Sequence, residues 1–574
     1  MNRAPTVAWV WSLVRLDIVG VLFAALFFCL SLTPSLLPRD WLTAGIIGAI
    51  NAAIGYGIGV LIGAIGRRLV LSRRSWWPPR RDVRRVLQAA VVVVAISASV
   101  LTVLQAAAWQ RDVAAVMGID GPATAGYLRT LVVALPIAAM LIAAARVVKD
   151  AIKFLARGMI RRWNLNDEIA MFVGTAIVAV LIITLVNGVL VRGFLAGASA
   201  VFQPRNTATR PGVEQPLRSE KSGSPSSFAP WDTLGFQGRN FTGTGPSAEE
   251  LTALNNRPAK EPIRIYAGLQ SAGTIEERVA VLLSELQRTR AYERSLLVMI
   301  PTTGTGWVDP VAARSIESMY NGDTVLVAMQ YSYLPSWISF LADQQKSIQA
   351  ARAMVDAVHR RWLHWPPAQH PVLALYGESL GSLAGQGAFE FLPDIAEKNV
   401  TSVLWVGPPN ASGLWKALTV RRDPGTPEVQ PRYDNGRTVR FAQASGPEEI
   451  AAVAVPAWDR PRVLFMQHAS DPVVWWSTDL LFRRPDWLSE PPGFDRSPSM
   501  RWYPIVTFWQ VSADMAGNIT NSTTTPTGHG HNYGDSQLDG WVAVAAPEGW
   551  TVVDTDRIRR SLEKTMAAGG PEFQ

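Results

Sequence analysis

Cysteine is nearly absent from this chain of 574 residues, and its one cysteine, Cys29, lies inside an apolar run close to the N-terminus. A single thiol can neither close an intramolecular disulfide nor supply the several ligands of a cysteine-based metal site. Histidine is also scarce, with six residues, so few imidazoles are available for acid–base chemistry. Stability and chemistry must therefore arise from packing, hydrogen bonds and a small number of titratable side chains.

Charge is missing from long stretches of roughly the first 195 residues, which are dominated by Ala, Val, Leu, Ile and Gly. A transmembrane helix needs about 20 apolar residues. No Asp, Glu, Lys, Arg or His lies at the centre of an apolar run, which argues against a transporter or proton relay. We therefore predict that residues 1–200 form an all-α transmembrane bundle that acts as an anchor or a platform. The five predicted helices lie near residues 18–37, 42–65, 86–108, 128–145 and 169–191.

The net charge of +8 is concentrated in two loops, as expected of a membrane protein and not of a nucleic-acid-binding surface. Positively charged loops stay in the cytoplasm. Five crossings then put the N-terminus inside and everything after residue 191 outside, in an integral cytoplasmic-membrane protein. The first run is long and lacks an Ala-x-Ala-like exit, so we expect no cleavable signal peptide. The two loops carry Arg67, Arg68, Arg73, Arg74, Arg80, Arg81, Arg84 and Arg85, and Lys149, Lys153, Arg157, Arg161 and Arg162.

Gly55, Gly59 and Gly63 recur every four residues on the second predicted helix. This spacing forms a groove in which another helix can pack closely. Packing within the bundle is one interpretation, and a homo-oligomer contact is the other.

Residues 201–262 are rich in Pro, Gly, Ser, Thr and Asn, and we predict a flexible linker there. Short apolar strands and amphipathic helices alternate over residues 263–574, which is typical of a mostly parallel, doubly wound sheet. In such sheets the chemistry gathers at the carboxyl ends of the strands. The predicted strands lie at 263–269, 295–300, 324–329, 372–376, 402–406 and 462–467, and the helices at 275–290, 343–362 and 538–546.

The sequence Tyr376-Gly377-Glu378-Ser379-Leu380-Gly381 follows one of these strands and precedes a helix-like run. A Gly-x-Ser-x-Gly in this context is the form of a nucleophile elbow, in which the serine sits on a strained turn. The motif alone is weak in a chain rich in glycine. Its context predicts Ser379 as a nucleophile.

A serine hydroxyl needs an imidazole to take its proton and a carboxylate to orient that imidazole, in the chain order Ser, acid, His on this kind of sheet. Asp471 follows a predicted strand and is the acid that we predict, with Asp479 and Asp514 as alternatives. Gly528-His529-Gly530-His531 lies on a glycine-rich loop before the last helix. We favour His531 as the base, with His529 as a close second. The other histidines, His359, His364, His370 and His468, are interpreted as surface or structural residues.

An oxyanion hole needs backbone N–H groups aimed at the developing charge. Leu380 should supply one, and the loop Pro301-Thr302-Thr303-Gly304-Thr305-Gly306-Trp307 the other, with Thr303 as our choice. His529 and His531 could instead hold a metal, but no cluster of Cys, Asp or Glu with ligand spacing lies nearby. We expect no metal and no cofactor.

The Gly377-x-Ser379-x-Gly381, Ser470-Asp471-Pro472 and Gly530-His531 sequences resemble the α/β-hydrolase superfamily. The whole chain resembles a family of bacterial, largely actinobacterial, membrane proteins that join an N-terminal helical domain to an α/β-hydrolase domain. The Pro-Thr-Thr-Gly-Thr-Gly-Trp and Gly-His-Gly-His-x-Tyr loops are typical of it. This resemblance implies serine-hydrolase chemistry and leaves the substrate undefined.

Trp475 and Trp476 follow the predicted acid, where they either line a pocket or pack in the core. Residues 407–461 lack clear periodicity and are predicted to form a cap. The sequence thus predicts a membrane-anchored serine hydrolase or acyltransferase acting through an acyl-enzyme on ester-linked acyl groups of cell-envelope lipids. The alternative is a catalytically silent hydrolase-like module for binding or scaffolding in envelope assembly.

Overall fold

A computed structural model describes residues 16–71, 81–186, 188, 192–455, 457–520 and 525–573. The chain divides into two compact units. The first comprises Met1–Leu195 together with two later segments, Thr478–Leu488 and Ser497–Gly517. The second comprises the remaining residues. The predicted cytoplasmic-loop residues Arg73, Arg74 and Arg80 lie outside the described residues.

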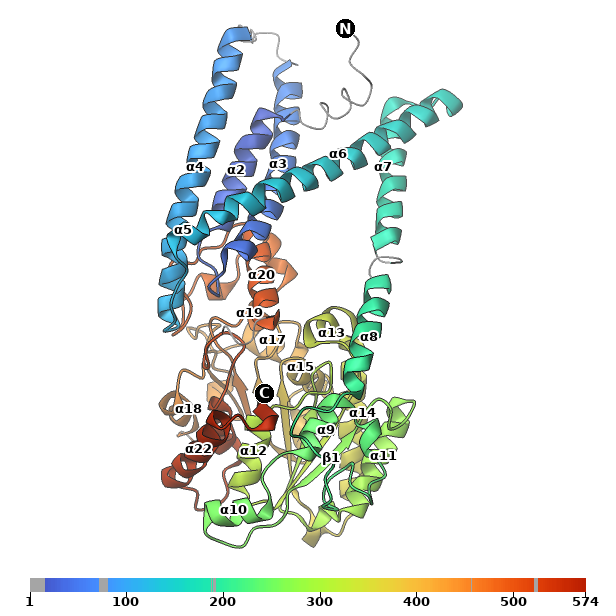
Figure 1. Cartoon of the computed structure of the whole chain (residues 1–574), viewed down its shortest axis with the longest axis vertical. Coiled ribbons are helices and arrows are strands. Elements are labelled where there is room, and N and C mark those ends of the chain that lie inside the picture. The colour runs from blue at the N-terminus through green and yellow to red at the C-terminus, as the bar shows by residue number, and fades with distance from the viewer. Residues whose placement is uncertain are drawn as a thin grey trace. The chain divides into compact units, whose positions relative to one another are not determined.

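Long apolar helices make up the first unit (Figure 1). Within the described residues, four spans are long and apolar enough to cross a membrane: Trp41–Leu69, Gln88–Val116, Thr124–Trp163 and Asp167–Thr184. They lie in helices α3 to α7. These helices are α2 (Ile18–Ser31), α3 (Trp41–Leu71), α4 (Arg81–Val116), α5 (Thr124–Tyr127), α6 (Arg129–Trp163) and α7 (Asp167–Thr184).

The first predicted crossing differs from the structure, because α2 has only 14 residues and ends at Ser31. Pro34 follows three residues later, and the residue before a proline is driven out of the helical region. The chain from Leu32 to Leu37 instead lies irregular and largely buried within the unit. Of the five predicted crossings, the one near residues 18–37 is therefore a shorter apolar helix in the structure.

The glycine face of α3 packs against α2. A Cβ on Gly55 would collide with the carbonyl oxygen of Phe23, and one on Gly59 would lie 2.5 Å from the carbonyl oxygen of Val19. This matches the interpretation in which the glycines serve packing within the bundle. A second copy of the chain could use this face only by displacing α2.

The late segment that carries α20 (Val506–Thr520) is bound to the α2–α3 connection by polar contacts inside the first unit. The Asp514 carboxylate pairs with the Arg39 guanidinium at 3.2 Å and accepts from the Leu36 N–H at 3.0 Å. The Gln510 amide donates to the carbonyl oxygens of Ser31 and Thr33. Both charged side chains are at most 3% exposed.

A seven-stranded, fully parallel sheet forms the second unit, in the order β1-β3-β2-β4-β5-β7-β6. The central strands are buried on both faces and read as continuous apolar runs, as parallel strands do. The predicted α/β-hydrolase fold class is confirmed. The strands are β1 (Ile263–Ala267), β2 (Leu296–Pro301), β3 (Thr324–Met329), β4 (Val372–Glu378), β5 (Val400–Val406), β6 (Val439–Ala442) and β7 (Arg462–Met466).

Helices cover both faces of this sheet (Figure 1). One face is covered by α11 (Ile275–Arg288), α14 (Gln344–Leu363) and α15 (Leu380–Gln386). The other is covered by α12 (Pro310–Met319), α18 (Pro447–Ala454), α21 (Ser536–Ala545) and α22 (Val552–Ala567), whose apolar side chains join the main core. The remaining helices are α8 (Arg192–Thr207), α9 (Gly235–Gly243), α10 (Ala248–Asn255), α13 (Ser336–Ala342), α16 (Pro393–Glu397), α17 (Gly413–Val420) and α19 (Pro472–Trp475).

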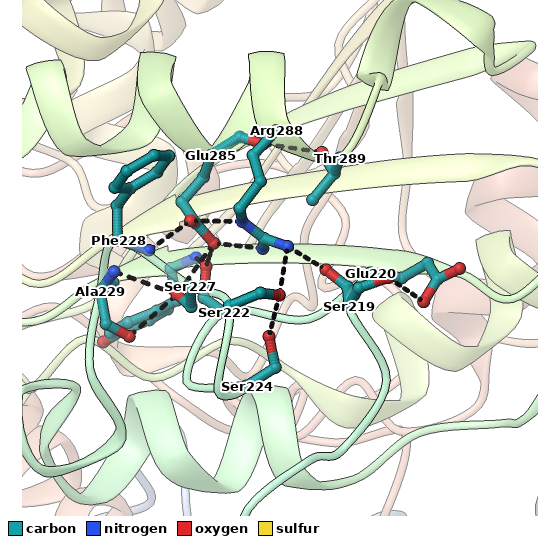
Figure 2. A network of polar contacts seen from close by, with 12 residues as sticks. Ser219, Glu220, Ser222, Ser224, Ser227, Phe228, Ala229, Glu285, Arg288 and Thr289 are labelled. Atoms are coloured by element: carbon teal, nitrogen blue, oxygen red, sulfur yellow. Dashed lines mark hydrogen bonds and ion pairs between the residues drawn. The ribbon is translucent and has the colours of Figure 1, made fainter.

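The predicted flexible linker is instead packed on the sheet domain. Figure 2 shows its centre, where the Glu285 carboxylate on α11 accepts from the Ser222 and Ser227 hydroxyls and from the Phe228 N–H. Arg288 pairs with the same carboxylate at 2.7 Å. A Pro/Gly/Ser-rich composition predicts irregular backbone, yet α9 and α10 lie within residues 201–262. Polar side chains that pair with a buried acid order the irregular part around Ser222.

The segment predicted to form a cap, residues 407–461, instead contributes a strand to the sheet. Residues 407–461 contain α17, α18 and the edge strand β6, whose register with β7 pairs Val439 with Val463. A four-residue strand at the edge leaves little periodicity in the sequence, which is why it escaped detection.

Candidate active site

Ser379 lies on the turn between β4 and α15 with φ 54° and ψ −124°, a conformation that non-glycine residues rarely adopt. The two motif glycines make the turn feasible. A Cβ on Gly377 would lie 2.5 Å from the Gly381 carbonyl oxygen, and one on Gly381 would collide with the carbonyl oxygen of Pro301. This is the geometry of a nucleophile elbow.

His531 and Asp471 form a hydrogen-bonded pair. Nδ1 of His531 lies 2.7 Å from Oδ2 of Asp471. The same carboxylate accepts from the Tyr533 hydroxyl at 2.8 Å and from the Val473 N–H at 2.8 Å. Burial lowers the pKa of His531, but the charge and hydrogen bond of Asp471 outweigh it and hold that pKa above its usual value.

Two backbone contacts connect the Ser379 turn with the His531 imidazole. The Ser379 N–H donates to the Val406 carbonyl oxygen at 2.9 Å. The next residue, Gly407, lies against the imidazole, since a Cβ there would be 2.5 Å from Cε1 of His531. Nε2 of His531 is buried and has no hydrogen-bond partner among the described residues. An imidazole held at Nδ1 and unpartnered at Nε2 is arranged to accept a proton at Nε2.

His529 pairs with a different acid. Its Nδ1 lies 3.4 Å from Oδ2 of Asp495, whose other oxygen accepts from the Ser470 N–H at 3.0 Å. His468 is fully buried, and its Nδ1 lies 2.7 Å from the Gly530 carbonyl oxygen. These contacts order the loop that carries His531.

The two predicted oxyanion groups differ in their surroundings. Leu380 is the first residue of α15, directly after Ser379. The Thr303 N–H points into its own loop, toward the Trp307 carbonyl oxygen at 3.4 Å. The loop itself lies beside the elbow, because Gly381 abuts Pro301. To donate to an oxyanion, the Thr303 N–H would therefore have to break its long, weak hydrogen bond to the Trp307 carbonyl oxygen.

The alternative acids have other surroundings. Asp514 is bound to Arg39, and Asp479 lies in the 3₁₀-helix Thr478–Leu481 of the first unit. His359, His364 and His370 lie on or just after α14. Within the described ranges, no group of three or more His, Cys, Asp or Glu side chains could hold a metal ion.

Tyr376, Glu378 and Gln537 form a buried polar cluster that the sequence analysis did not single out. The Tyr376 hydroxyl lies 2.8 Å from Oε2 of Glu378 and 2.5 Å from Oε1 of Gln537. Burial, and then the charge of Asp309, raise the pKa of Glu378 to about 8. The only available signal was that Glu378 is a charged residue inside an otherwise small, neutral elbow motif.

Apolar side chains flank the nucleophile. Phe340 on α13 packs with Leu380 and Leu383 of α15, and the partly exposed Trp476 joins this cluster. Trp476 meets Phe340 edge to face with ring centroids 5.8 Å apart. Trp475, by contrast, is fully buried and donates to the His468 carbonyl oxygen at 3.0 Å. One of the two tryptophans is thus core, and the other lies near Ser379.

A doubly wound parallel sheet with a strained serine between β4 and the following helix belongs to the α/β-hydrolase class of folds. The chain is a member of the alpha/beta-hydrolase family, whose model matches residues 263–558. A second model, the alpha/beta-hydrolase family N-terminus, matches residues 32–246. No curated protein and no solved structure matches the chain.

Proposed function

We propose that the protein is a membrane-anchored serine hydrolase or acyltransferase that acts through an acyl-enzyme on ester-linked acyl groups of cell-envelope lipids. The observation that carries the proposal is the His531–Asp471 pair, whose imidazole lies against Gly407 while its buried Nε2 has no partner among the described residues. Together with the strained Ser379 turn, this pair supports the roles of nucleophile, base and acid.

The reaction follows from these positions. The Ser379 hydroxyl oxygen attacks the ester carbonyl carbon as its proton passes to Nε2 of His531. The N–H of Leu380 and a donor from the Thr303 loop hold the resulting oxyanion. Collapse breaks the ester bond, and the departing alkoxide takes the proton from Nε2. Water, or a second alcohol, then gives its proton to Nε2 of His531 and attacks the acyl-serine carbonyl carbon. The bond to the Ser379 oxygen breaks, that oxygen takes the proton back from Nε2, and an acid or a new ester leaves.

Asp471 acts through the imidazole. Its carboxylate fixes the proton on Nδ1, so that Nε2 presents a lone pair, and it stabilises the imidazolium that forms. We assign the base to His531 and a positioning role to His529, because His529 lies against Asp495.

An apolar acyl chain fits the surroundings of Ser379, since Phe340, Leu380 and Trp476 supply an apolar wall. The membrane helices keep the domain at a lipid surface, where such chains are available. The loop charges favour an extracytoplasmic domain in a bacterial envelope.

A fluorophosphonate probe tests the nucleophile. The full chain in detergent should be labelled, and Ser379→Ala should abolish labelling, because only an activated serine reacts with the probe at a useful rate. Ser284→Ala, which removes an exposed hydroxyl on α11, is the matched control and should label as the wild type does. Equal labelling of wild type and Ser379→Ala would refute the assignment.

Envelope lipids test the substrate. Cells that carry Ser379→Ala should accumulate an esterified lipid that wild-type cells process. Full in-cell function of the Ser379→Ala protein would favour the binding or scaffolding alternative instead.

A further inference from the structure

A groove of 1080 Å³ runs along α2, α3 and α6 inside the membrane unit. One stretch of its lining is apolar and includes Ile50, Ile54 and Leu141. The other stretch is strongly polar and is formed by the start of α2, the middle of α6 and α3 from its centre at Tyr56 to Arg67. Its polar side chains are Asp17, Tyr56, Arg67, Arg146, Lys149, Asp150 and Lys153.

The polar stretch is organised around a buried side chain, Tyr56, which is 8% exposed. The Tyr56 hydroxyl accepts from Nη2 of Arg146 at 2.8 Å and from the Asp17 N–H at 3.0 Å. Both contacts use the hydroxyl oxygen as an acceptor. Its own proton therefore remains to be donated, and an anionic oxygen in the groove is a suitable acceptor.

Positive charge exceeds negative charge around this hydroxyl, with four cationic and two anionic side chains in the lining. Asp17 is already engaged, since it pairs with Arg67 at 3.1 Å and caps α2 through the Val19 and Gly20 N–H groups. Lys149 and Lys153 lie one turn apart on α6 and are exposed. The site therefore favours an anion.

The apolar stretch identifies the kind of anion. Ile50 precedes Tyr56 by six residues on α3, and Leu141 precedes Arg146 by five on α6, so roughly 8–9 Å of each helix separates the apolar side chains from the polar centre. A free phosphate would fill only the polar end and leave the apolar wall uncovered. A helix of another protein would need acids opposite the cations. A lipid with a charged headgroup and long chains covers both parts.

We propose that this groove binds one anionic diacyl glycerophospholipid, with its phosphate at Tyr56 and Arg146 and its acyl chains along Ile50 and Leu141. Under the orientation that the loop charges predict, the site faces the cytoplasmic leaflet, which is rich in anionic lipids. This role is independent of Ser379 and would make the membrane unit a lipid-binding element as well as an anchor.

Native mass spectrometry of the full chain in detergent, supplied with phosphatidylglycerol or phosphatidylcholine, tests the proposal. The wild type should retain one phosphatidylglycerol in preference to phosphatidylcholine. The triple variant Arg146→Gln/Lys149→Gln/Lys153→Gln should bind phosphatidylglycerol on the order of 100-fold more weakly, at about fivefold per cation. The control Arg157→Gln/Arg161→Gln/Arg162→Gln removes equal charge from the same helix outside the groove and should bind as the wild type does.

A second variant fills the groove beside Tyr56 without changing any charge. Gly57 lines the groove, and a Cβ there meets no atom within 4 Å. Gly57→Leu should therefore fold, favour the helix and displace the lipid. Equal retention of both lipids, equal loss in the two triple variants, or undiminished binding by Gly57→Leu would each overturn the proposal, as would saturation of the site by inorganic phosphate.

Discussion

Tyr533 holds two histidines in place with a single side chain. Its hydroxyl donates to Asp471 at 2.8 Å and accepts from the His468 N–H at 3.1 Å. Its ring stacks on His468 with centroids 4.1 Å apart. The orientation of the His531–Asp471 pair therefore depends on the hydroxyl of a neighbouring phenol.

Removing this hydroxyl tests that dependence. Tyr533→Phe should lower kcat for a short-chain ester by about tenfold and leave KM nearly unchanged, because Asp471 loses one donor worth about 1.4 kcal/mol. Steady-state kinetics of the full chain provide the measurement. Tyr433→Phe, a partly exposed tyrosine in the same unit, should change neither constant. A rise in KM at constant kcat would contradict the positioning role.

Glu378 predicts a particular dependence of stability on pH. The pKa of a glutamate is about 4.3 in an unfolded chain, whereas that of Glu378 in the fold is about 8. Between these pH values the folded state holds a proton that the unfolded chain has lost. The contribution of protonated Glu378 to the free energy of unfolding is therefore complete below about pH 4.3 and is lost as the pH rises toward 8. The Gln side chain of Glu378→Gln stays neutral, so this variant should not lose that stability as the pH rises.

The melting temperature of the full chain in detergent, measured at about pH 5 and about pH 8, checks this prediction. The melting temperature of the wild type, relative to that of Glu378→Gln, should be lower at about pH 8 than at about pH 5. If the two proteins show parallel melting temperatures across this range, Glu378 does not hold a proton in the fold.

At the scale of elements, α11 and the irregular segment around residues 222–228 pack together through hydrogen bonds to Glu285. Glu285 is fully buried and links this segment to Arg288. Burial raises the pKa of Glu285, but the Arg288, Phe228 and Ser222 hydrogen bonds outweigh burial and lower that pKa below its usual value.

Glu285→Gln should therefore lower the free energy of unfolding by about 2 kcal/mol at neutral pH, because it weakens several charge-assisted hydrogen bonds. Chemical denaturation provides the measurement. Below about pH 4 the difference in the free energy of unfolding between wild type and Glu285→Gln should become smaller. A carboxylate with a lowered pKa stabilises the fold only where it is ionised. Glu276→Gln, an exposed change in the first turn of α11, is the control.

The elements that the sequence predicted are those with strong periodicity. The strands at 324–329 and 372–376 and the helix at 275–290 correspond to β3, β4 and α11 within two residues. The strand β6 was missed because four residues carry no periodic signal. The order of residues 201–262 was missed because it depends on a buried acid on another element, which composition does not reveal.

The site divides in the same way. The Gly377-x-Ser379-x-Gly381 turn is a local motif, so the sequence predicted its conformation. The choice between His531 and His529 was left open, because it depends on which carboxylate the fold places opposite each ring. Glu378 became visible only once the structure showed its burial and its neighbours.

At the scale of the whole molecule, the buried Arg39–Asp514 pair joins two parts of the chain that are 475 residues apart in sequence. Asp514→Ala should cost about 3–5 kcal/mol of stability, because it leaves Arg39 charged in a buried place. The double variant Arg39→Met/Asp514→Leu should recover most of this loss. Thermal unfolding of the full chain in detergent measures both, and equal loss in the single and double variants would contradict a role for the unpaired charge.

The division of the chain also bears on its synthesis. Residues 478–488 and 497–517 belong to the same compact unit as the N-terminal helices, and Gln510 and Asp514 contact the connection between the first two of these. On the ribosome, Arg39 is made 475 residues before Asp514. The first unit therefore lacks its neutralising carboxylate until the intervening residues have been translated, and a product that stops before Asp514 lacks this closure.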